Sequence, residues 1–305
     1  MPTASDVQIL AVADLPAEPE WLALQSTPVV AYGDQAHINA DVIVADEQAA
    51  VGLAEKIATQ PQASLVLVQV LRAGEHLSAN LALDLESLAF ATLQGGGEFA
   101  AWLAGRNEAP AQVRGEGPAV LLARSNNELF ACLNRPQLRN SITVEMREAL
   151  VEALELLLLD DSLTKMILSG LGDCFSVGGE LREFGTALDP ATAHWVRTVQ
   201  SPARLLARAS ERLECWLHGA CIGSGLELPA FAKRVVAHPK TFFQLPELQL
   251  GLIPGAGGTV SISRRIGRQR TAWMALSGRR VNAKTALAWG LVDELTSPDW
   301  VPPAP

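Results

Sequence analysis

Hydrophobic and polar residues follow two different spacings along the first part of the chain. Short apolar runs typical of β-strands come first, at residues 7–13, 28–33 and 41–46. From about residue 46 the apolar residues recur three and four positions apart, which is the spacing of one helix face. The predicted helices cover residues 46–60, 63–93 with a break near Gly74, and 97–106. This part of the chain is therefore expected to form short strands followed by helices.

A polar stretch rich in glycine and proline, residues 107–118, follows these helices. Clusters of glycine and proline of this kind mark loops between structured segments. We therefore expect an N-terminal region over residues 1–118, mostly helical from about residue 46, and a second unit over residues 119–305.

In the second unit, strand-like apolar runs alternate with segments of helical spacing. The strand-like runs are residues 119–125, 127–134, 165–171, 214–223, 234–239 and 241–251. The helical segments are residues 141–160, about 188–213, and several between 257 and 290. Ser141 or Thr143 is the expected cap of the first of these helices. Strands that alternate with helices predict an α/β fold with much parallel pairing.

Composition and charge argue against several classes of protein. The 305 residues are 49% hydrophobic, which is enough for a sizeable core, and the net charge of −9 argues against general nucleic-acid binding. The cysteines at 132, 174, 215 and 221 form no CxxC pair, and no histidine spacing suggests a metal site. The N-terminus does not resemble a signal peptide, and no apolar run is long enough to span a membrane. These features favour a cytoplasmic protein without a metal ion.

Three glycine-bearing segments follow predicted strands, at residues 175–181, 223–228 and 254–259. Glycine permits a tight turn and lets a ligand approach the backbone, and the first turn of a helix has unpaired N–H donors. Two such donors from different loops would form an oxyanion hole, which stabilises a negatively charged oxygen in the transition state. None of the three segments matches the GxGxxG or GxxxxGK[ST] nucleotide-binding motifs.

Two glutamates lie beside the glycine segments. Glu227 falls near the first turn of the helix expected after Ser224, and Glu247 lies within the apolar sequence LPELQLGLIPGAGGT. A pair of carboxyl groups in apolar surroundings beside an oxyanion hole can perform acid/base chemistry on a carbonyl compound. The residues alone leave two other interpretations open: Glu227 as a solvated partner of the helix dipole, and Glu247 as a paired structural carboxylate.

Five motifs in the second unit occur in the order found in one known family. They are LNRPQLRNSI, ILSGLGDCFSVGGELREF, CWLHGACIGSGLELPA, RVVAHPKTFFQLPELQLGLIPGAGGT and LSGRRVNAKTALAWGLVDEL. Over about residues 119–295 the chain resembles the crotonase (enoyl-CoA hydratase/isomerase) superfamily. The resemblance implies an α/β fold built as a crotonase-like spiral of ββα units, here with an added helical region. It also implies an acyl-CoA thioester as substrate and no separate cofactor.

The resemblance implies roles for particular residues. The backbone N–H groups of Gly179 and Ser224 would hold the thioester oxygen, and Ser224 stands where the family usually has glycine. Glu227 would position and activate the water that attacks C3, and Glu247 would exchange the proton at C2. Because both hydratase glutamates are present, addition of water to a 2-enoyl-CoA, a lyase reaction, is favoured. Glu180 replaces the aspartate of the family's GAD sequence.

Further expectations concern CoA binding, assembly and the exact reaction. Gln137, Arg139 and Val177 match positions that contact CoA, although Arg139 is equally well explained as a solvated surface residue. The resemblance implies a trimer or hexamer. Another reaction on an acyl-CoA stays open (isomerisation, hydrolysis, decarboxylation or oxygenation of an aromatic acyl group). A non-enzymatic protein that binds acyl-CoA also stays open.

The N-terminal region departs from the family pattern. The family's C-terminal helical tail does not follow the last motif, but residues 54–106 resemble that tail, including an acidic LExxAF and a closing FxxxLxxR. One interpretation is a relocated tail, placed ahead of the core and capping the active site. A second is an unrelated helical domain over the pocket. A third is a remnant of a duplicated core, suggested by TPVVAYGD and ADVIVADEQ.

Overall fold

The first strand-like runs form a small parallel sheet. This computed structural model describes residues 7–107, 109, 111–297 and 299–300. The remaining residues, which include parts of the predicted N-terminal region and boundary, lie outside the described residues. In the sheet, β2 (Val29–Tyr32) lies between β1 (Gln8–Ala11) and β3 (Val42–Val44). The strand predictions for this part of the chain are confirmed.

The helices predicted for the N-terminal region follow this sheet. They are α1 (Glu47–Ile57), α2 (Pro61–Gly74), α3 (Ala79–Gln94) and α4 (Gly97–Ala104). The Asp46 side chain caps α1 by accepting a 2.8 Å hydrogen bond from the N–H of Ala49. Pro61 fits the first position of α2, because the first amide of a helix has no partner within it. The break expected near Gly74 is the end of α2.

The second unit contains a six-stranded sheet in the order β12-β9-β7-β6-β5-β4. Its strands are β4 (Val120–Ser125), β5 (Glu128–Leu133), β6 (Lys165–Gly170), β7 (Leu213–Leu217), β9 (Arg234–Ala237) and β12 (Glu294–Leu295). β4 and β5 form an antiparallel hairpin, and the other neighbours pair in parallel. Parallel neighbours need long crossovers, which helices supply here. The predicted α/β class with much parallel pairing is confirmed.

A second sheet, in the order β11-β10-β8, corrects two predictions. Its strands are β8 (Ala220–Ile222), β10 (Phe242–Gln244) and β11 (Val281–Asn282). The single strand predicted over 214–223 is wrong, because the chain turns at Gly219 (φ = +59°) and β7 and β8 belong to different sheets. A Cβ atom at Gly219 would lie 2.2 Å from the carbonyl oxygen of Asp173, so glycine is required. The extended piece predicted over 241–251 is only partly right, since Glu247–Leu250 is a 3₁₀ helix.

The remaining helices surround these sheets. They are α5 (Val144–Leu159), α6 (Pro190–Val199), α7 (Pro202–Ala209), α8 (Ser224–Glu227), α9 (Gly258–Ile266), α10 (Arg268–Ser277) and α11 (Ala283–Trp289). Thr143 caps α5 by accepting a 3.1 Å hydrogen bond from the N–H of Met146. The continuous helix predicted over about 188–213 is wrong, because Pro202 begins a new helix and disfavours the helical conformation in the residue before it. Within the described residues, no helix combines the length and apolar character needed to traverse a bilayer.

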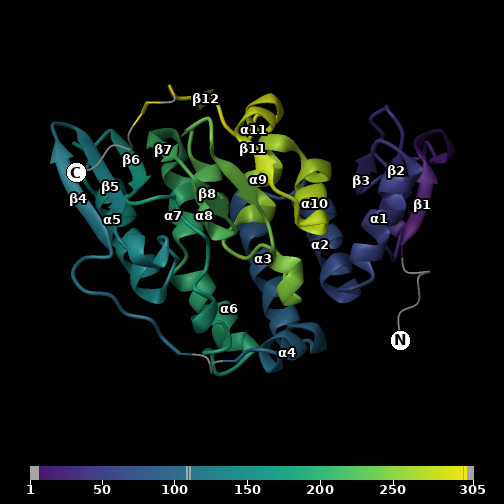
Figure 1. The fold of residues 1–305 in the computed structure, drawn as a ribbon, viewed down its shortest axis with the longest axis horizontal. Helices are drawn as coiled ribbons and strands as arrows, with labels where there is room; N and C mark the ends of the chain where they lie inside the picture. The colour runs from purple at the N-terminus through teal and green to yellow at the C-terminus, as the bar shows by residue number, and fades with distance from the viewer. Residues whose placement is uncertain (1–6, 108, 110, 298, 301–305) are drawn as a thin grey trace.

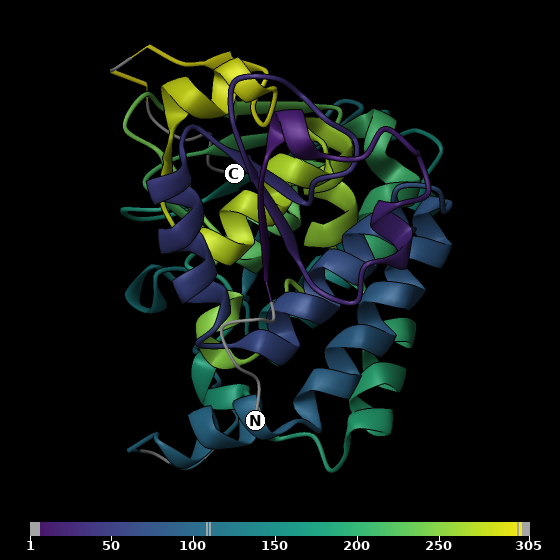
Figure 2. The same ribbon diagram turned by 90° about the vertical axis from the view of Figure 1, so that its right-hand side faces the viewer.

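The N-terminal region packs onto the second unit instead of standing apart from it (Figures 1 and 2). α2 contacts α9 and α10, and α3 contacts α6, α7 and α9. One continuous apolar core contains Val30, Leu67 and Phe90 from the N-terminal region together with Leu168 and Phe243 from the second unit. The two parts of the chain therefore fold around a shared interior.

Buried charged side chains hold the small N-terminal sheet in place. Arg72 of α2 pairs with Asp41, whose Oδ2 also accepts a 2.8 Å hydrogen bond from the N–H of Val29 in β2. Arg268 of α10 donates a 2.7 Å hydrogen bond to the carbonyl oxygen of Ala40. The sheet is thus tied both to a helix of its own region and to a helix of the second unit.

Replacing Leu67 by alanine tests whether the two parts share one core. Leu67 is fully buried in α2, and its truncation is expected to lower the free energy of unfolding by about 2–5 kcal/mol. Because the core is continuous, the loss should appear in a single urea transition followed by circular dichroism. The matched control is Leu81→Ala on α3, which trims a half-exposed side chain and should cost about 0.5 kcal/mol or less. Two separate transitions, only one of them shifted by Leu67→Ala, would contradict the shared core.

Candidate active site

Four of the residues predicted for the site line one cavity of about 430 Å³. Gly179 comes from the loop after β6, Ser224 and Glu227 from α8, and Glu247 from the 3₁₀ helix after β10. The fold therefore brings residues that are far apart in the sequence into one place.

Glu227 is almost fully buried at the end of α8, with 2% of its surface exposed. Its Oε2 accepts hydrogen bonds from the N–H groups of Ala256 at 2.8 Å and of Gly258 at 2.9 Å. Gly258 permits this approach, since a Cβ atom there would lie 2.6 Å from Cγ of Glu227. Burial raises the pKa of Glu227 well above its usual range, and the negative charges of Glu247 and Glu86 raise it further.

Glu247 is buried in the apolar sequence that precedes the third glycine segment. Among the residues that the structure describes, its Oε2 has no hydrogen-bond partner. Its Oε1 lies against Gly223, where the backbone has φ = +52° and a Cβ atom would come within 2.6 Å of this oxygen. Burial raises the pKa of Glu247 to about 8, and the charge of Glu86 adds to the shift. The Glu247 side chain is therefore mostly protonated near neutral pH, with one oxygen available to a ligand.

The two predicted oxyanion-hole donors are backbone N–H groups on adjoining loops. Within the described part of the chain, neither the N–H of Gly179 nor that of Ser224 donates a hydrogen bond. The loops touch, because the N–H of Ile222 donates to the carbonyl oxygen of Ser176 at 3.1 Å, and a Cβ atom at Gly178 would lie 2.5 Å from the carbonyl oxygen of Ile222. Unpartnered donors on neighbouring loops are what an oxyanion hole requires.

A third buried carboxyl group, that of Glu86 in α3, is absent from the site residues predicted from the sequence. Its Oε1 accepts from the N–H of Gly257 at 2.6 Å, and its Oε2 accepts from the N–H and the hydroxyl of Thr259 at 2.9 and 2.6 Å. Burial, only partly offset by these hydrogen bonds, raises the pKa of Glu86 to about 7. The LExxAF motif contains this glutamate, but the motif does not indicate that it meets the third glycine segment.

The N-terminal region closes one side of the cavity. Phe90 and Gln94 of α3 line it, and a Cβ atom at Gly255 would lie 2.2 Å from the Phe90 ring. At the start of α4, the backbone of Glu98 lies against Gly251. A relocated family tail would make such contacts, and an unrelated helical domain over the pocket would make them too. The relocation therefore stays a proposal, and so does the interpretation as a remnant of a duplicated core.

The residues expected to contact CoA lie near one another, outside the cavity walls. The N–H of Val177 donates to the carbonyl oxygen of Arg139 at 3.2 Å, and Gln137 belongs to the short 3₁₀ helix that precedes Arg139. Gln137 and Arg139 are exposed. Because Val177 is two residues before Gly179, the group lies next to the predicted oxyanion hole. Its role in CoA binding stays a prediction.

Other candidate groups in the described residues either have hydrogen-bond partners within the protein or are buried. Glu180 lines the cavity, but hydrogen bonds from Arg182 at 2.7 Å and from Ser141 at 2.8 Å lower its pKa. The free cysteines are all buried: Cys132, Cys174, Cys215 and Cys221. Within the same described ranges, no group of three or more His, Cys, Asp or Glu side chains could hold a metal ion.

The second unit is similar to known proteins. Residues 126–302 match the sequence model of the family described as enoyl-CoA hydratase/isomerase. The chain is 33% identical to a 2,3-dehydroadipyl-CoA hydratase of Escherichia coli, over 59% of this chain and 70% of that protein. It is 29% identical to a trans-2-decenoyl-[acyl-carrier-protein] isomerase of Streptococcus mutans, over 59% and 70% of the two chains. A solved enoyl-CoA hydratase of Mycobacterium smegmatis matches with a TM-score of 0.55 at 27% identity, covering 60% of this chain and 71% of that one.

Replacing Glu247 by glutamine tests the raised pKa through stability. A carboxyl group whose pKa is raised on folding holds its proton more tightly in the folded state, so stability should fall as the pH rises from 4.5 to about 8. Because Glu247→Gln lacks this ionisation, its free energy of unfolding, relative to that of the wild type, should increase between about pH 5 and about pH 9. Urea titrations at both pH values measure this difference, with Glu211→Gln at an exposed position as control. The same difference at both pH values would contradict the assignment.

Proposed function

This chain belongs to the enoyl-CoA hydratase/isomerase family of enzymes, and we propose that it adds water to the C2–C3 double bond of a 2-enoyl-CoA. One observation carries the proposal: a single cavity is lined by two buried glutamates and by two residues whose backbone N–H groups have no partner within the described chain. The family match supports an acyl-CoA as substrate. Hydration is the lyase reaction that uses all four of these groups.

The N–H groups of Gly179 and Ser224 act on the thioester oxygen. When water adds to C3, electrons move through the double bond and the carbonyl group, and negative charge accumulates on that oxygen. Each well-placed donor can lower the barrier by about 3 kcal/mol, because its hydrogen bond strengthens as the charge develops. Since neither N–H is paired inside the described part of the protein, no internal hydrogen bond must break before the substrate binds.

The two glutamates divide the base and acid roles. Burial raises the pKa of both glutamates, but the two backbone N–H bonds to Oε2 of Glu227 lower its pKa in part and stabilise a carboxylate. We therefore assign the negative charge of the pair to Glu227. Oε2 of Glu247 has no donor among the described residues, which favours its protonated form. Glu227 takes a proton from water as the water oxygen bonds to C3, and Glu247 gives its proton to C2. The pair therefore keeps its number of protons through the reaction.

A double-bond isomerase is the second candidate. The same acid pair favours it, because a proton taken from one carbon and returned to another moves a double bond without adding water. The isomerase among the relatives also supports it. The products of hydration and of isomerisation differ in mass by one water, so mass spectrometry of the products distinguishes the two reactions.

Assembly and location stay predictions. The family resemblance implies a trimer or a hexamer. The buried free thiols suit a reducing compartment, where disulfides are rare, and we propose the cytoplasm as the location. Sedimentation of the purified protein would measure the first of these properties directly.

Replacing Glu247 by glutamine is expected to lower kcat for hydration by about 10²- to 10⁴-fold, because glutamine fills the same space but cannot give a proton to C2. Binding of a saturated acyl-CoA, which cannot be hydrated, should change little. Product mass and calorimetry provide the two readouts. Glu211→Gln, at an exposed position, controls for the loss of one carboxylate. Turnover near the wild-type rate in Glu247→Gln would rule out this mechanism.

Ser224→Ala tests whether the second donor is the backbone N–H or the hydroxyl group. The hydroxyl is buried and has no partner among the described residues, and alanine removes it while keeping the N–H. If the backbone is the donor, kcat should stay within a few-fold of the wild-type value. A loss of about a hundredfold, as expected for removal of an oxyanion-hole donor, would assign the role to the hydroxyl. Ser64→Ala is a matched control, because that hydroxyl is also buried without a partner but lies in α2, away from the cavity walls.

A further inference from the structure

Two arginine side chains line the cavity and form no ion pair with another described residue. Arg147 comes from α5 and Arg197 from α6, and both line the cavity that holds Glu227 and Glu247. Within the described residues, every hydrogen-bond partner of these two guanidinium groups is uncharged. Buried or half-buried charges are normally paired, because an unpaired charge is costly to remove from water. Because no carboxyl group of the described residues hydrogen-bonds to them, these two arginines are available to bind an anionic ligand.

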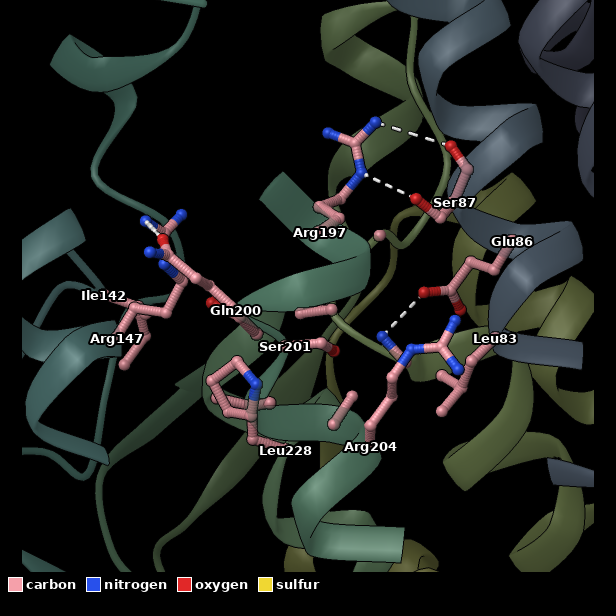
Figure 3. A pocket seen from close by; sticks show the side chains of 16 residues that line it. Leu83, Glu86, Ser87, Ile142, Arg147, Arg197, Gln200, Ser201, Arg204 and Leu228 are labelled. Carbon is pink, nitrogen blue, oxygen red and sulfur yellow. Dashed lines mark hydrogen bonds between the residues drawn. The ribbon is translucent and has the colours of Figure 1, made fainter. Parts of the chain in front are cut away.

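Contacts on one side hold Arg197 in a defined orientation. Its Nε donates to the hydroxyl of Ser87 at 3.3 Å, and its Nη1 donates to Oε1 of Gln94 at 3.0 Å. The guanidinium carbon lies 4.4 Å from the centroid of the Phe90 ring, a cation–π distance. Figure 3 shows Arg197 joined to Ser87 by two hydrogen bonds. The guanidinium group is thus positioned before a ligand enters, and it keeps N–H donors that these neutral contacts do not use.

The guanidinium group of Arg147 makes fewer hydrogen bonds than that of Arg197. It donates a 3.2 Å hydrogen bond to Oε1 of Gln200, and its buried Nε has no partner in the described part of the chain. Figure 3 shows Arg147 beside Gln200, to the left of Arg197. A second cavity of about 90 Å³ is bordered by both arginines and by Ser224. The two guanidinium groups therefore adjoin the space beside a proposed oxyanion-hole donor.

No carboxyl group of the described residues hydrogen-bonds to either arginine, although the charges of Glu148 and Glu183 act on Arg147. Burial raises the pKa of Glu86, whose charge acts on Arg197, to about 7, and it raises the pKa of Glu247 to about 8. Both carboxyl groups are therefore only partly ionised near neutral pH. Burial also lowers the pKa of Arg147, and it lowers that of Arg197 to about 10, which still leaves Arg197 charged. Two guanidinium groups that form no ion pair with the described carboxyl groups can bind an anionic ligand.

We propose that Arg147 and Arg197 bind a carboxylate at the far end of the acyl group, so that the substrate is the CoA thioester of an unsaturated dicarboxylic acid. The proposal rests on the proposed thioester site and specifies the acyl group that enters it. Guanidinium groups bind carboxylates through paired, charge-assisted hydrogen bonds. Ile142, Ala193 and Val196 line the same cavity and give the methylene groups of the acyl chain an apolar surface.

A phosphate group of CoA is the other anion that two arginines can bind. The residues expected to contact CoA, Gln137, Arg139 and Val177, are absent from the cavity walls. Arg147 and Arg197, in contrast, share those walls with both glutamates. This placement favours the acyl end of the substrate over its nucleotide end.

Matched saturated thioesters test the proposal without requiring turnover. Calorimetry compares succinyl-, adipyl- and suberyl-CoA, which end in a carboxylate, with butyryl-, hexanoyl- and octanoyl-CoA, which have the same lengths and end in a methyl group. The wild type is expected to bind the carboxylate-ended member of at least one pair about tenfold to a hundredfold more tightly. Arg197→Gln and Arg147→Gln should each remove most of this preference and leave the affinity for the methyl-ended thioester nearly unchanged. Arg208→Gln, at an exposed position of α7, should keep the full preference.

The possible outcomes separate this proposal from the proposed function. Equal affinity of the wild type for both members of every pair would overturn the proposal and leave the hydratase function standing. Equal losses of affinity for both members and for free CoA in the arginine variants would assign these residues to a CoA phosphate instead. If the wild type binds no thioester, both proposals fail. Circular dichroism checks that each variant folds, and if one arginine variant is unfolded, the other one decides.

Discussion

The architecture of the site depends on the hydrogen bonds that the backbone N–H groups of the turn before α9 donate. The first amide N–H groups of a helix have no partners within it. Here two buried glutamates accept hydrogen bonds from these groups, in alternation along the chain. Glu227 accepts from residues 256 and 258, and Glu86 accepts from residues 257 and 259. Because Glu227 belongs to α8 and Glu86 to α3, this single turn fixes the N-terminal region against the second unit.

The same turn explains the electrostatics of the cavity. Carboxyl groups buried close together raise the pKa of one another, whereas N–H donors at a helix N-terminus favour the charged form. Glu227 has such donors, and Oε2 of Glu247 has none among the described residues. Two chemically identical side chains therefore have different hydrogen-bond surroundings, and the proposed division into a base and an acid rests on this difference.

The cavity belongs to both parts of the chain, although the family match begins at residue 126. Phe90 and Gln94 line it from α3, and Gln94 also orients Arg197. The glutamates and the arginines line the same cavity, so the proposed proton-transfer groups share it with two guanidinium groups. The segment that departs from the family pattern thus contributes directly to the part of the site that would distinguish one acyl group from another.

The sequence by itself predicted most of the local structure and indicated the two glutamates of the proposed acid pair. The helices within residues 46–106 were predictable because helical spacing, caps and breaks depend on near neighbours, and Glu247 was found through a motif match. The prediction of one strand over 214–223 was wrong, because an apolar pattern does not reveal the turn that tertiary contacts impose at Gly219. Only the tertiary structure brought Arg197 to the cavity and Glu86 to the turn before α9, since their helices are distant in sequence and spacing does not specify which helix faces meet. Their burial, and the pKa shifts that follow from it, exist only in the folded protein.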